Sequence, residues 1–250
     1  MLIENRFSQI LKILEQQQSV TVLELTELLN TSESTIRRDL TELHKQGLLI
    51  KVHGGAVSNG MNYMTQDAEI SDRQELNREE KLSIASYCAG LIQDLDFVYL
   101  DAGSTTELII EYLKAVQAVF VTNGLTHARK LAARGFKVYL IGGMLKSTTE
   151  AVVGTEAVES LMKYNFTKGF FGTNGVNHKS GFTTPETDEA LVKKTAMAKC
   201  KEAYIVCDSS KFNQISSITF AGFNDTQIIT SNLKDISYKK YENIVEVDVQ

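Results

Sequence analysis

A short segment of the chain carries four polar residues whose types suit contacts with nucleic-acid bases and phosphates: Ser34, Thr35, Arg37 and Arg38. An arginine can donate two parallel hydrogen bonds to guanine, and serine or threonine hydroxyls suit bases or phosphates. Ile36, Leu40 and Leu43 recur there at helical spacing, so a helix would bury these three and expose the polar side chains. The alternative is an ordinary solvated helix face, and the neighbouring elements decide between the two.

Those neighbours have the pattern of a winged helix-turn-helix. Apolar residues three and four apart predict helices over residues 3–17, 22–29 and 33–45, and Gly47 ends the third. Residues 48–57 predict a small β-hairpin with glycines at its tip. The third helix would therefore enter a DNA groove with its N-terminal half, beside the hairpin wing.

The hairpin adds two candidate DNA contacts, Lys51 and His53. For His53, at the tip, the alternative is a turn residue without a DNA contact. We expect Glu33 and Asp39 to orient the arginines rather than to touch DNA.

The charge balance is unusual for a DNA-binding chain, because the formal net charge is −5. Residues 1–57 do not reverse it, since six cations (Arg6, Lys12, Arg37, Arg38, Lys45, Lys51) face seven anions (Glu4, Glu15, Glu24, Glu27, Glu33, Asp39, Glu42). We therefore expect a homodimer or homotetramer, in which paired domains multiply the phosphate contacts.

A second group of residues suits a phosphate. Asp101-Ala102-Gly103-Ser104-Thr105-Thr106 follows an apolar strand and opens a predicted helix, whose N-terminal N–H groups and dipole favour an anion. One such turn often only caps a helix. Three more polar, glycine-bearing loops follow later strands, at 122–124, 142–146 and 172–175, and would meet at one sheet edge.

Together these loops predict a site for a phosphorylated ligand, with Lys146 as the cation that pairs with the phosphate. A solvent-facing lysine is the alternative for Lys146. The candidate residues from the four loops are Asp101, Gly103, Ser104, Thr105, Thr106, Thr122, Asn123, Gly142, Gly143, Lys146, Asn174 and Gly175.

Beyond residue 70 the pattern changes to alternating strands and helices, which predicts a mostly parallel sheet with helices on both faces. Helices are expected at 75–93, 105–114 and 124–134, and a further helix with Thr184 as N-cap and Pro185 as its first residue. Strands are expected at 97–100, 118–121, 138–141, 168–173, 203–207, 227–230 and 243–247. The fold class is thus α/β, with a winged helix-turn-helix DNA-binding domain at 1–57, a linker at 58–70 and a sensor domain at 71–250.

The sequence resembles the DeoR family of bacterial transcriptional regulators. The resemblance rests on Ser34-Thr35-Ile36-Arg37-Arg38-Asp39-Leu40, the Gly47 stop and His53-Gly54-Gly55-Ala56, and covers the whole chain. It implies a winged helix joined to a sugar-phosphate sensor that resembles ribose-5-phosphate isomerase. A family pattern Asp-x-Ser/Thr-Lys also implies that Asp208 and Lys211 line the ligand pocket, and that residues 183–186 either lie near the ligand or only cap a helix.

The resemblance also bears on catalysis. Isomerase relatives carry a catalytic carboxylate on the helix after the glycine-rich loop, and Lys194 falls near that position, with Glu189 within one turn. Loss of this base implies a sensor rather than an enzyme. An isomerase-like enzyme is the alternative. A DNA-binding scaffold without a ligand would lack phosphate donors in its pocket, and the glycine- and hydroxyl-bearing loops of this sequence contradict that reading.

Within the family, Gly142–Thr149, Gly154 and Gly181–Pro185 are most similar to fructose-operon repressors, which implies fructose 1-phosphate as the effector. Tagatose 6-phosphate and other hexose or pentose phosphates stay open. No cofactor and no metal are expected, because Cys88, Cys200 and Cys207 have neither metal nor redox spacing. No apolar run approaches the ~18 residues of a membrane span and no leader is recognised, so a cytoplasmic protein is expected.

Overall fold

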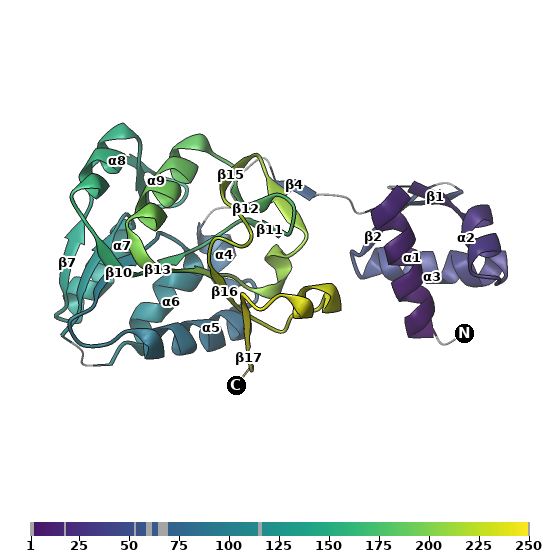
Figure 1. Ribbon diagram of the computed structural model, residues 1–250, viewed down its shortest axis with the longest axis horizontal. Coiled ribbons are helices and arrows are strands. Elements are labelled where there is room, and N and C mark those ends of the chain that lie inside the picture. The colour runs from purple at the N-terminus through teal and green to yellow at the C-terminus, as the bar shows by residue number, and fades with distance from the viewer. Residues whose placement is uncertain are drawn as a thin grey trace. The chain divides into compact units, whose positions relative to one another are not determined.

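The computed structural model describes residues 3–17, 19–52, 54–58, 62–64, 70–114 and 117–249. The chain divides into two compact units, Met1–Asn62 and Tyr63–Gln250 (Figure 1). The division falls inside the segment 58–70 proposed as a linker, of which residues 59–61 and 65–69 lie outside the described residues.

The first unit contains the predicted helices and hairpin. Its elements are α1 (Ile3–Gln17), β1 (Ser19–Thr21), α2 (Val22–Leu28), α3 (Glu33–Lys45), β2 (Leu49–Val52) and β3 (Gly55–Ser58). Thr21 and Glu24 form a reciprocal capping box that starts α2. The Ser32 hydroxyl accepts from the Thr35 amide and starts α3, and Gly47, at φ +71°, lets the chain turn after it.

A small core holds these helices against an antiparallel sheet of order β1-β3-β2. Ile36, Leu40 and Leu43 of α3 are fully buried, together with Ile10 of α1 and Leu25 of α2. The apolar stripe predicted for α3 is therefore its inward face, and the arginines lie on the opposite side.

The second unit begins beside the division and contains the remaining elements. Its helices are α4 (Ile70–Glu75), α5 (Arg78–Leu91), α6 (Ser104–Tyr112), α7 (Leu125–Ala133), α8 (Thr155–Met162) and α9 (Thr187–Ala198), with 3₁₀ turns η1 (Ser209–Lys211) and η2 (Ile236–Lys240). Its strands are β4 (Asn62–Met64), β5 (Phe97–Leu100), β6 (Val119–Thr122), β7 (Lys137–Leu140), β8 (Met144–Lys146), β9 (Ala151–Val153), β10 (Phe166–Phe171), β11 (Gly175–Asn177), β12 (Gly181–Thr184), β13 (Cys200–Val206), β14 (Gln214–Ser216), β15 (Ile218–Ala221), β16 (Gln227–Ser231) and β17 (Ile244–Val247).

Seven strands form a parallel sheet of order β17-β16-β13-β10-β5-β6-β7. From β5 the chain winds outward through β6 to β7, and then returns to β10 and winds the other way. The boundary between β5 and β10 is thus the switch point at which open α/β sheets form ligand crevices. Helices α5 and α6 cover one face and α8 and α9 the other (Figure 1).

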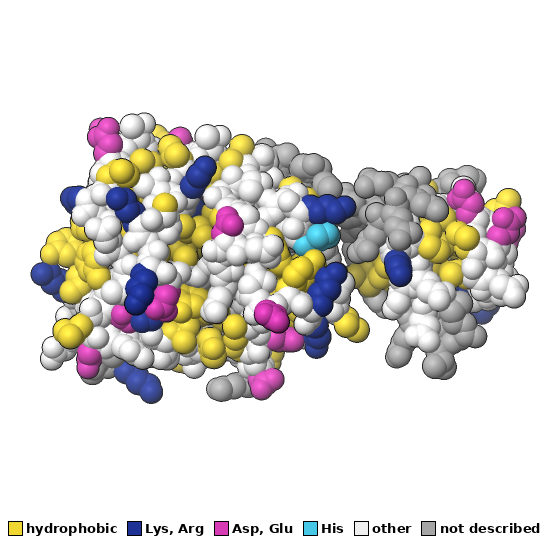
Figure 2. Space-filling model, in the orientation of Figure 1, with side chains coloured by type: hydrophobic (Ala, Val, Ile, Leu, Met, Phe, Trp, Pro, Cys, Tyr) yellow, Lys and Arg dark blue, Asp and Glu magenta, His cyan; other side chains and the backbone are white. Residues whose placement is uncertain are grey.

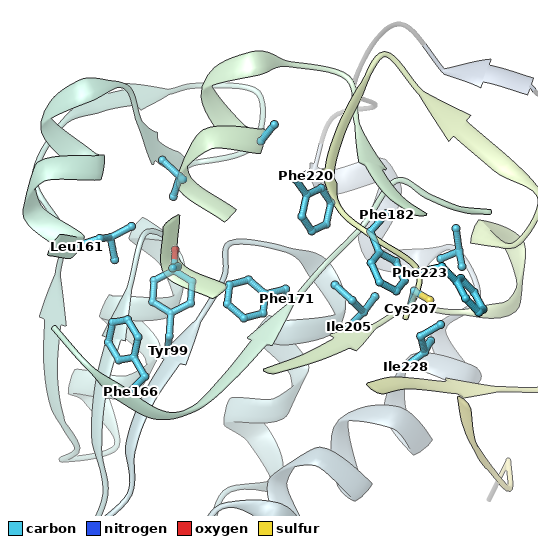
Figure 3. Packing of buried hydrophobic residues seen from close by; sticks show 14 of the residues in the cluster. Tyr99, Leu161, Phe166, Phe171, Phe182, Ile205, Cys207, Phe220, Phe223 and Ile228 are labelled. Carbon is cyan, nitrogen blue, oxygen red and sulfur yellow. The ribbon is translucent and has the colours of Figure 1, made fainter. Parts of the chain in front are cut away.

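Aromatic side chains fill the core on the α8–α9 side. Tyr99 of β5 lies between Phe166 and Phe171 of β10, with ring centroids 5.3 Å from each (Figure 3). Phe182 packs on Phe220 and Phe223 toward the small antiparallel sheet β11-β12-β15. That sheet and the hairpin β8-β9 were not predicted, since their strands are short.

Two predicted helix boundaries are wrong. The helix expected at 75–93 begins only at Arg78, because Asn77 adopts a left-handed conformation with φ +52°, and the separate helix α4 precedes it at Ile70–Glu75. Thr184 does not cap a helix: it ends β12, where it pairs with Ile218 of β15. The N-cap of α9 is Glu186, and Pro185 lies between strand and cap.

The β7 edge of the sheet is apolar and open. Tyr139 and Leu140 of β7 are about two-fifths exposed, and Met144 and Leu145 of β8 are exposed as well. Hydrophobic side chains gather on that side of the face drawn in Figure 2. None of the helices in the described ranges combines the length and apolar character needed to cross a bilayer.

Candidate functional site

The exposed face of α3 and strand β2 form a shallow basic hollow. It is lined by Arg37, Arg38, Thr41, Glu42, Lys45 and Lys51. The Lys51 ammonium donates to the Thr41 hydroxyl at 2.7 Å, so the wing strand is tied to the helix. Five of these six side chains can donate hydrogen bonds, and four are cations, which suits the phosphates and base edges of DNA.

The N-terminal turn of α3 presents the other predicted DNA contacts. Ser34 and Thr35 lie next to the Ser32 cap, whose hydroxyl is 3.0 Å and 2.9 Å from theirs. Arg37 pairs with Glu33 at 3.1 Å on the exposed helix surface, as expected from the sequence. His53 lies outside the described residues.

Asp39 has a different role from the expected one. It is buried on the inner face of α3 and forms a two-point ion pair with Arg6 of α1. The expectation that Asp39 orients the arginines is therefore wrong, because Asp39 fixes α3 against α1 from within.

The second unit has a polar cleft at the carboxyl ends of β5, β10 and β13, the three central strands. It is lined by Arg73, Leu76, Lys81, Ala102, Gly103, Ser104, Thr105, Thr149, Gly172, Thr173, Asn174, Glu189, Lys193, Val206, Cys207, Asp208 and Lys211. Of the residues proposed from the sequence, the cleft brings together Gly103, Ser104, Thr105, Asn174, Asp208 and Lys211.

One side of the cleft is cationic. The buried Lys81 ammonium donates to the Ser104 hydroxyl at 3.2 Å, and Arg73 and Lys211 lie on the same wall. Burial lowers the pKa of Lys81; nearby Asp208 opposes this, and the charges of Lys211 and Arg73 reinforce it. A cation cluster at the N-terminus of α6 favours a bound anion.

The other side carries an acidic, hydroxyl-rich group of residues. Glu189 is buried and accepts hydrogen bonds from Lys146 at 3.0 Å, Thr149 at 3.1 Å and Thr184 at 3.1 Å. Thr184 also bonds the side-chain oxygen of Asn174 at 3.2 Å. Carboxylate and amide oxygens here can accept hydrogen bonds from ligand hydroxyl groups.

Lys193, which lines the cleft, forms a buried ion pair with Asp101, which lies outside the lining. The second carboxylate contact of Asp101 is the Gly172 amide at 3.0 Å, and Lys193 also donates to the Gly172 carbonyl at 3.1 Å. This pair joins β5, α9 and the loop after β10, and so fixes the loops around the cleft.

The remaining predicted residues lie outside the cleft lining and support its loops. Asn123 accepts from the Ala102 amide at 2.8 Å, and the Thr122 hydroxyl accepts from Gly124. Thr106 is buried, and its hydroxyl lies 3.1 Å from Nε2 of His127. Burial lowers the pKa of His127 to about 4.

Three predicted glycines and Lys146 also lie away from the lining. A side chain at Gly143 or Gly175 would meet backbone oxygens at 2.9 Å and 2.3 Å, so both allow close packing of loops. Gly142 is exposed. Lys146 lies between Glu186 at 2.9 Å and Glu189.

Three cations that line the cleft, Arg73, Lys81 and Lys193, were not predicted from the sequence. Arg73 and Lys81 both lie before the first glycine-rich loop: Lys81 is in the segment for which the sequence predicts only a helix, and Arg73 precedes that segment, on α4. Lys193 is next to Lys194, which was considered but is exposed. The signal for Lys193 was its position four residues after Glu189, on the same side of α9.

The winged helix with an exposed basic face, joined to an α/β unit with an anion-favouring cleft, defines a two-domain transcriptional regulator. The chain belongs to the DeoR family: residues 6–61 match the DeoR-like helix-turn-helix domain, and residues 76–232 match the DeoR C terminal sensor domain.

Curated relatives extend over the whole chain. It is 39% identical to an uncharacterized HTH-type transcriptional regulator FruR of Bacillus subtilis, covering 100% of this chain and 99% of the relative. It is 34% identical to a lactose phosphotransferase system repressor of Staphylococcus epidermidis, covering 97% and 98%.

Solved structures with a similar arrangement include two proteins of low identity. Ribose 5-phosphate isomerase A from Methanocaldococcus jannaschii is 16% identical over 54% of this chain and 55% of that chain, with a TM-score of 0.42. The sorbitol operon regulator SorC from Klebsiella pneumoniae is 12% identical over 83% and 90%, with a TM-score of 0.37.

Proposed function

We propose that this protein represses a sugar-utilisation operon and leaves its operator when a phosphorylated sugar occupies the cleft of the second unit. The relatives named as FruR and as lactose phosphotransferase system repressors support control of sugar use. The observation that carries the proposal is the cation cluster beside Ser104 at the start of α6, of which Lys81 and Lys211 lie within the matched sensor domain.

The DNA-binding surface is the outer face of α3 with the wing. Arg37 and Arg38 contact base edges, and Ser34 and Thr35 contact bases or phosphates. Lys51 on β2, and His53, contact the sugar-phosphate backbone. The exposure of α3's polar face and the Lys51–Thr41 contact support this assignment.

In the cleft, the phosphate binds at Ser104 and Thr105 with Lys81 and Lys211, and the sugar hydroxyls face Asn174 and Glu189. The other proposed effector residues hold the loops in place rather than line the cleft. Fructose 1-phosphate is the proposed effector, supported by the resemblance to FruR. Tagatose 6-phosphate is the second candidate, because it too has a phosphate at one end and free hydroxyls beyond it.

The second unit acts as a sensor and not as an isomerase. Its relatives are named as regulators and repressors, which supports this. Glu189, the carboxylate closest to the position considered for a catalytic base, already accepts three hydrogen bonds, one of them from the Lys146 ammonium. Formation of product from a panel of sugar phosphates would overturn this part of the proposal.

The active form is a homodimer or homotetramer in the bacterial cytoplasm, where the operator DNA lies. The low net charge of residues 1–57 supports assembly, because a single domain offers few cations to the phosphates. The exposed apolar side chains of β7 and β8 support contact between second units.

The experiment that tests the function has two stages. The full chain is first screened by thermal shift against sugar phosphates and the matching free sugars, since a ligand that binds the folded state raises the Tm. Operator DNA is selected from a random pool, and release is then followed by fluorescence anisotropy. We expect a sugar phosphate, and not its free sugar, to raise the Tm and to release the DNA. The proposal is wrong if the chain selects no DNA from the pool. It is also wrong if no sugar phosphate both raises the Tm and releases the DNA.

A further inference from the structure

The chain enters the second unit at β4, which pairs with β14, and the next element, α4, forms part of the cleft wall. Ile70 begins α4 eight residues after Asn62, where the first unit ends. Arg73 of α4 and Leu76 just after it line the cleft together with Ser104 and Lys211. The segment that leads to the DNA-binding unit is therefore also part of the effector site.

Three hydrogen bonds between described residues help to hold α4 and the turn after it to the rest of the unit. The Lys81 ammonium donates to the backbone carbonyl of Arg73. Gln74 donates to Oε2 of Glu107 on α6 at 3.2 Å. Asn77, in its left-handed conformation, donates to Oδ1 of Asp208 at 2.7 Å. Both Lys81 and Asp208 line the cleft, so two of the three contacts involve residues that a ligand would touch.

The charges at this wall favour a ligand-dependent position of α4. Arg73, Lys81 and Lys211 share the wall with Asp208, and the charges of Arg73 and Lys211 disfavour the charged form of Lys81. The like charges of these three cations repel one another. A phosphate dianion bound between them would attract all three. Lys81 has three N–H donors. Among the described residues, the Arg73 carbonyl and the Ser104 hydroxyl accept from two of them, and the third can donate to a phosphate oxygen.

We propose that α4 is the element that transmits effector occupancy to the DNA-binding unit: the effector phosphate binds Lys81 and the Arg73 guanidinium together and holds α4 against the cleft. This inference rests on the proposed function. The ligand then favours the state in which α4 is docked, and that state restricts the chain that leads to the winged helix. Operator DNA favours the state in which α4 is less tightly held, so the two ligands oppose each other.

Hydrogen exchange on the full chain tests the proposal directly. Peptides covering residues 70–77 are compared with fructose 1-phosphate, with inorganic phosphate and with free fructose. We expect about tenfold slower exchange in this segment with the phosphorylated sugar, a smaller effect with phosphate and none with fructose. If saturating effector releases the DNA but leaves hydrogen exchange at α4 unchanged, α4 does not transmit effector occupancy. The proposed function would still hold in that case.

Two variants separate binding from transmission. Arg73→Gln should weaken effector binding by about 10- to 100-fold, the range expected for loss of a charged hydrogen bond, and should lose the protection of α4. Gln74→Ala leaves the cleft lining intact but removes the Glu107 contact. We expect its effector affinity to stay within about threefold of wild type, and operator release to require about tenfold more effector.

Arg78→Gln is the matched control, because Arg78 is exposed on α5 and lies outside the cleft lining. It should behave as wild type in every measurement. If Gln74→Ala needs the same effector concentration as wild type to release the operator, the proposed transmission through α4 is wrong. If no sugar phosphate binds the wild-type chain, the proposed function is wrong, and the proposed transmission through α4 is wrong as well.

Discussion

The Lys146 ammonium lies 3.0 Å from Oε1 of Glu189, with Glu186 2.9 Å away on its other side. Two carboxylates thus balance the one cation that sequence analysis assigned to the phosphate. The cations that line the cleft are Arg73, Lys81, Lys193 and Lys211.

Replacing Lys81 by Met should reduce sugar-phosphate affinity by about 10- to 100-fold, since a charged hydrogen bond is lost while the aliphatic stem is kept. Lys146→Met should change the affinity by less than about threefold and lower stability by about 1–3 kcal/mol, because buried Glu189 loses its cation. Isothermal titration calorimetry and urea unfolding measure the two effects. An equal loss of affinity in both variants would restore Lys146 as the phosphate partner.

The Asp101–Lys193 pair gives a stability prediction. Lys193→Met should lower the free energy of unfolding by about 3–5 kcal/mol, because it leaves the buried Asp101 carboxylate without its cation. The control is Lys194→Met one residue later, whose side chain is exposed and whose loss should change stability by less than about 0.5 kcal/mol. If Lys193→Met and wild type unfold at the same urea concentration, the buried pair contributes nothing to stability.

The DNA-binding face can be tested at Arg38. Arg38→Ala should weaken operator binding by about 1–3 kcal/mol and leave effector binding unchanged, because Arg38 is exposed on α3. Lys12→Ala is the control, since it removes the same charge from the exposed side of α1. Fluorescence anisotropy at several salt concentrations compares them. Equal losses would mean that net charge, rather than the α3 face, determines binding.

His127 predicts a pH dependence of stability. Its folded pKa of about 4 lies below the ordinary value of 6.5, so the unfolded chain binds a proton that the folded chain does not. The free energy of unfolding should therefore fall as the pH drops from 6.5 toward 4, by up to about 3 kcal/mol. His127→Gln should flatten this slope in urea unfolding between pH 7 and pH 4. A slope identical to wild type would exclude His127 as its source.

Assembly can be tested at the β7 edge. Tyr139→Lys places a charge among exposed apolar side chains and should shift the protein toward smaller species in light scattering after gel filtration. Ile236→Lys makes the same kind of change at another exposed apolar residue and should leave the mass unchanged. A wild-type mass for Tyr139→Lys would remove β7 from the proposed interface.

Local patterns in the sequence predicted most of the secondary structure. The apolar stripe of α3, its Ser32 cap and Gly47 act within a few residues, and the strands of the parallel sheet were recognised from their apolar runs. The two errors, at Asn77 and at Thr184, occur where contacts with distant residues override the local preference. Asn77 bonds Asp208, 131 residues away, and Thr184 pairs with Ile218 of β15.

The residue types in the sequence by themselves determined that polar, glycine-bearing loops follow the strands and that two arginines share one helix face. Only the tertiary structure decided which loops meet. The strand order puts β5, β10 and β13 side by side, so their loops line the cleft while those after β6 and β7 support it. The tertiary structure also pairs Lys146 with Glu189 and Asp39 with Arg6. The physical reason is that helix and strand patterns record short-range periodicity, whereas a cleft depends on the order of strands and on side-chain pairs far apart in the chain.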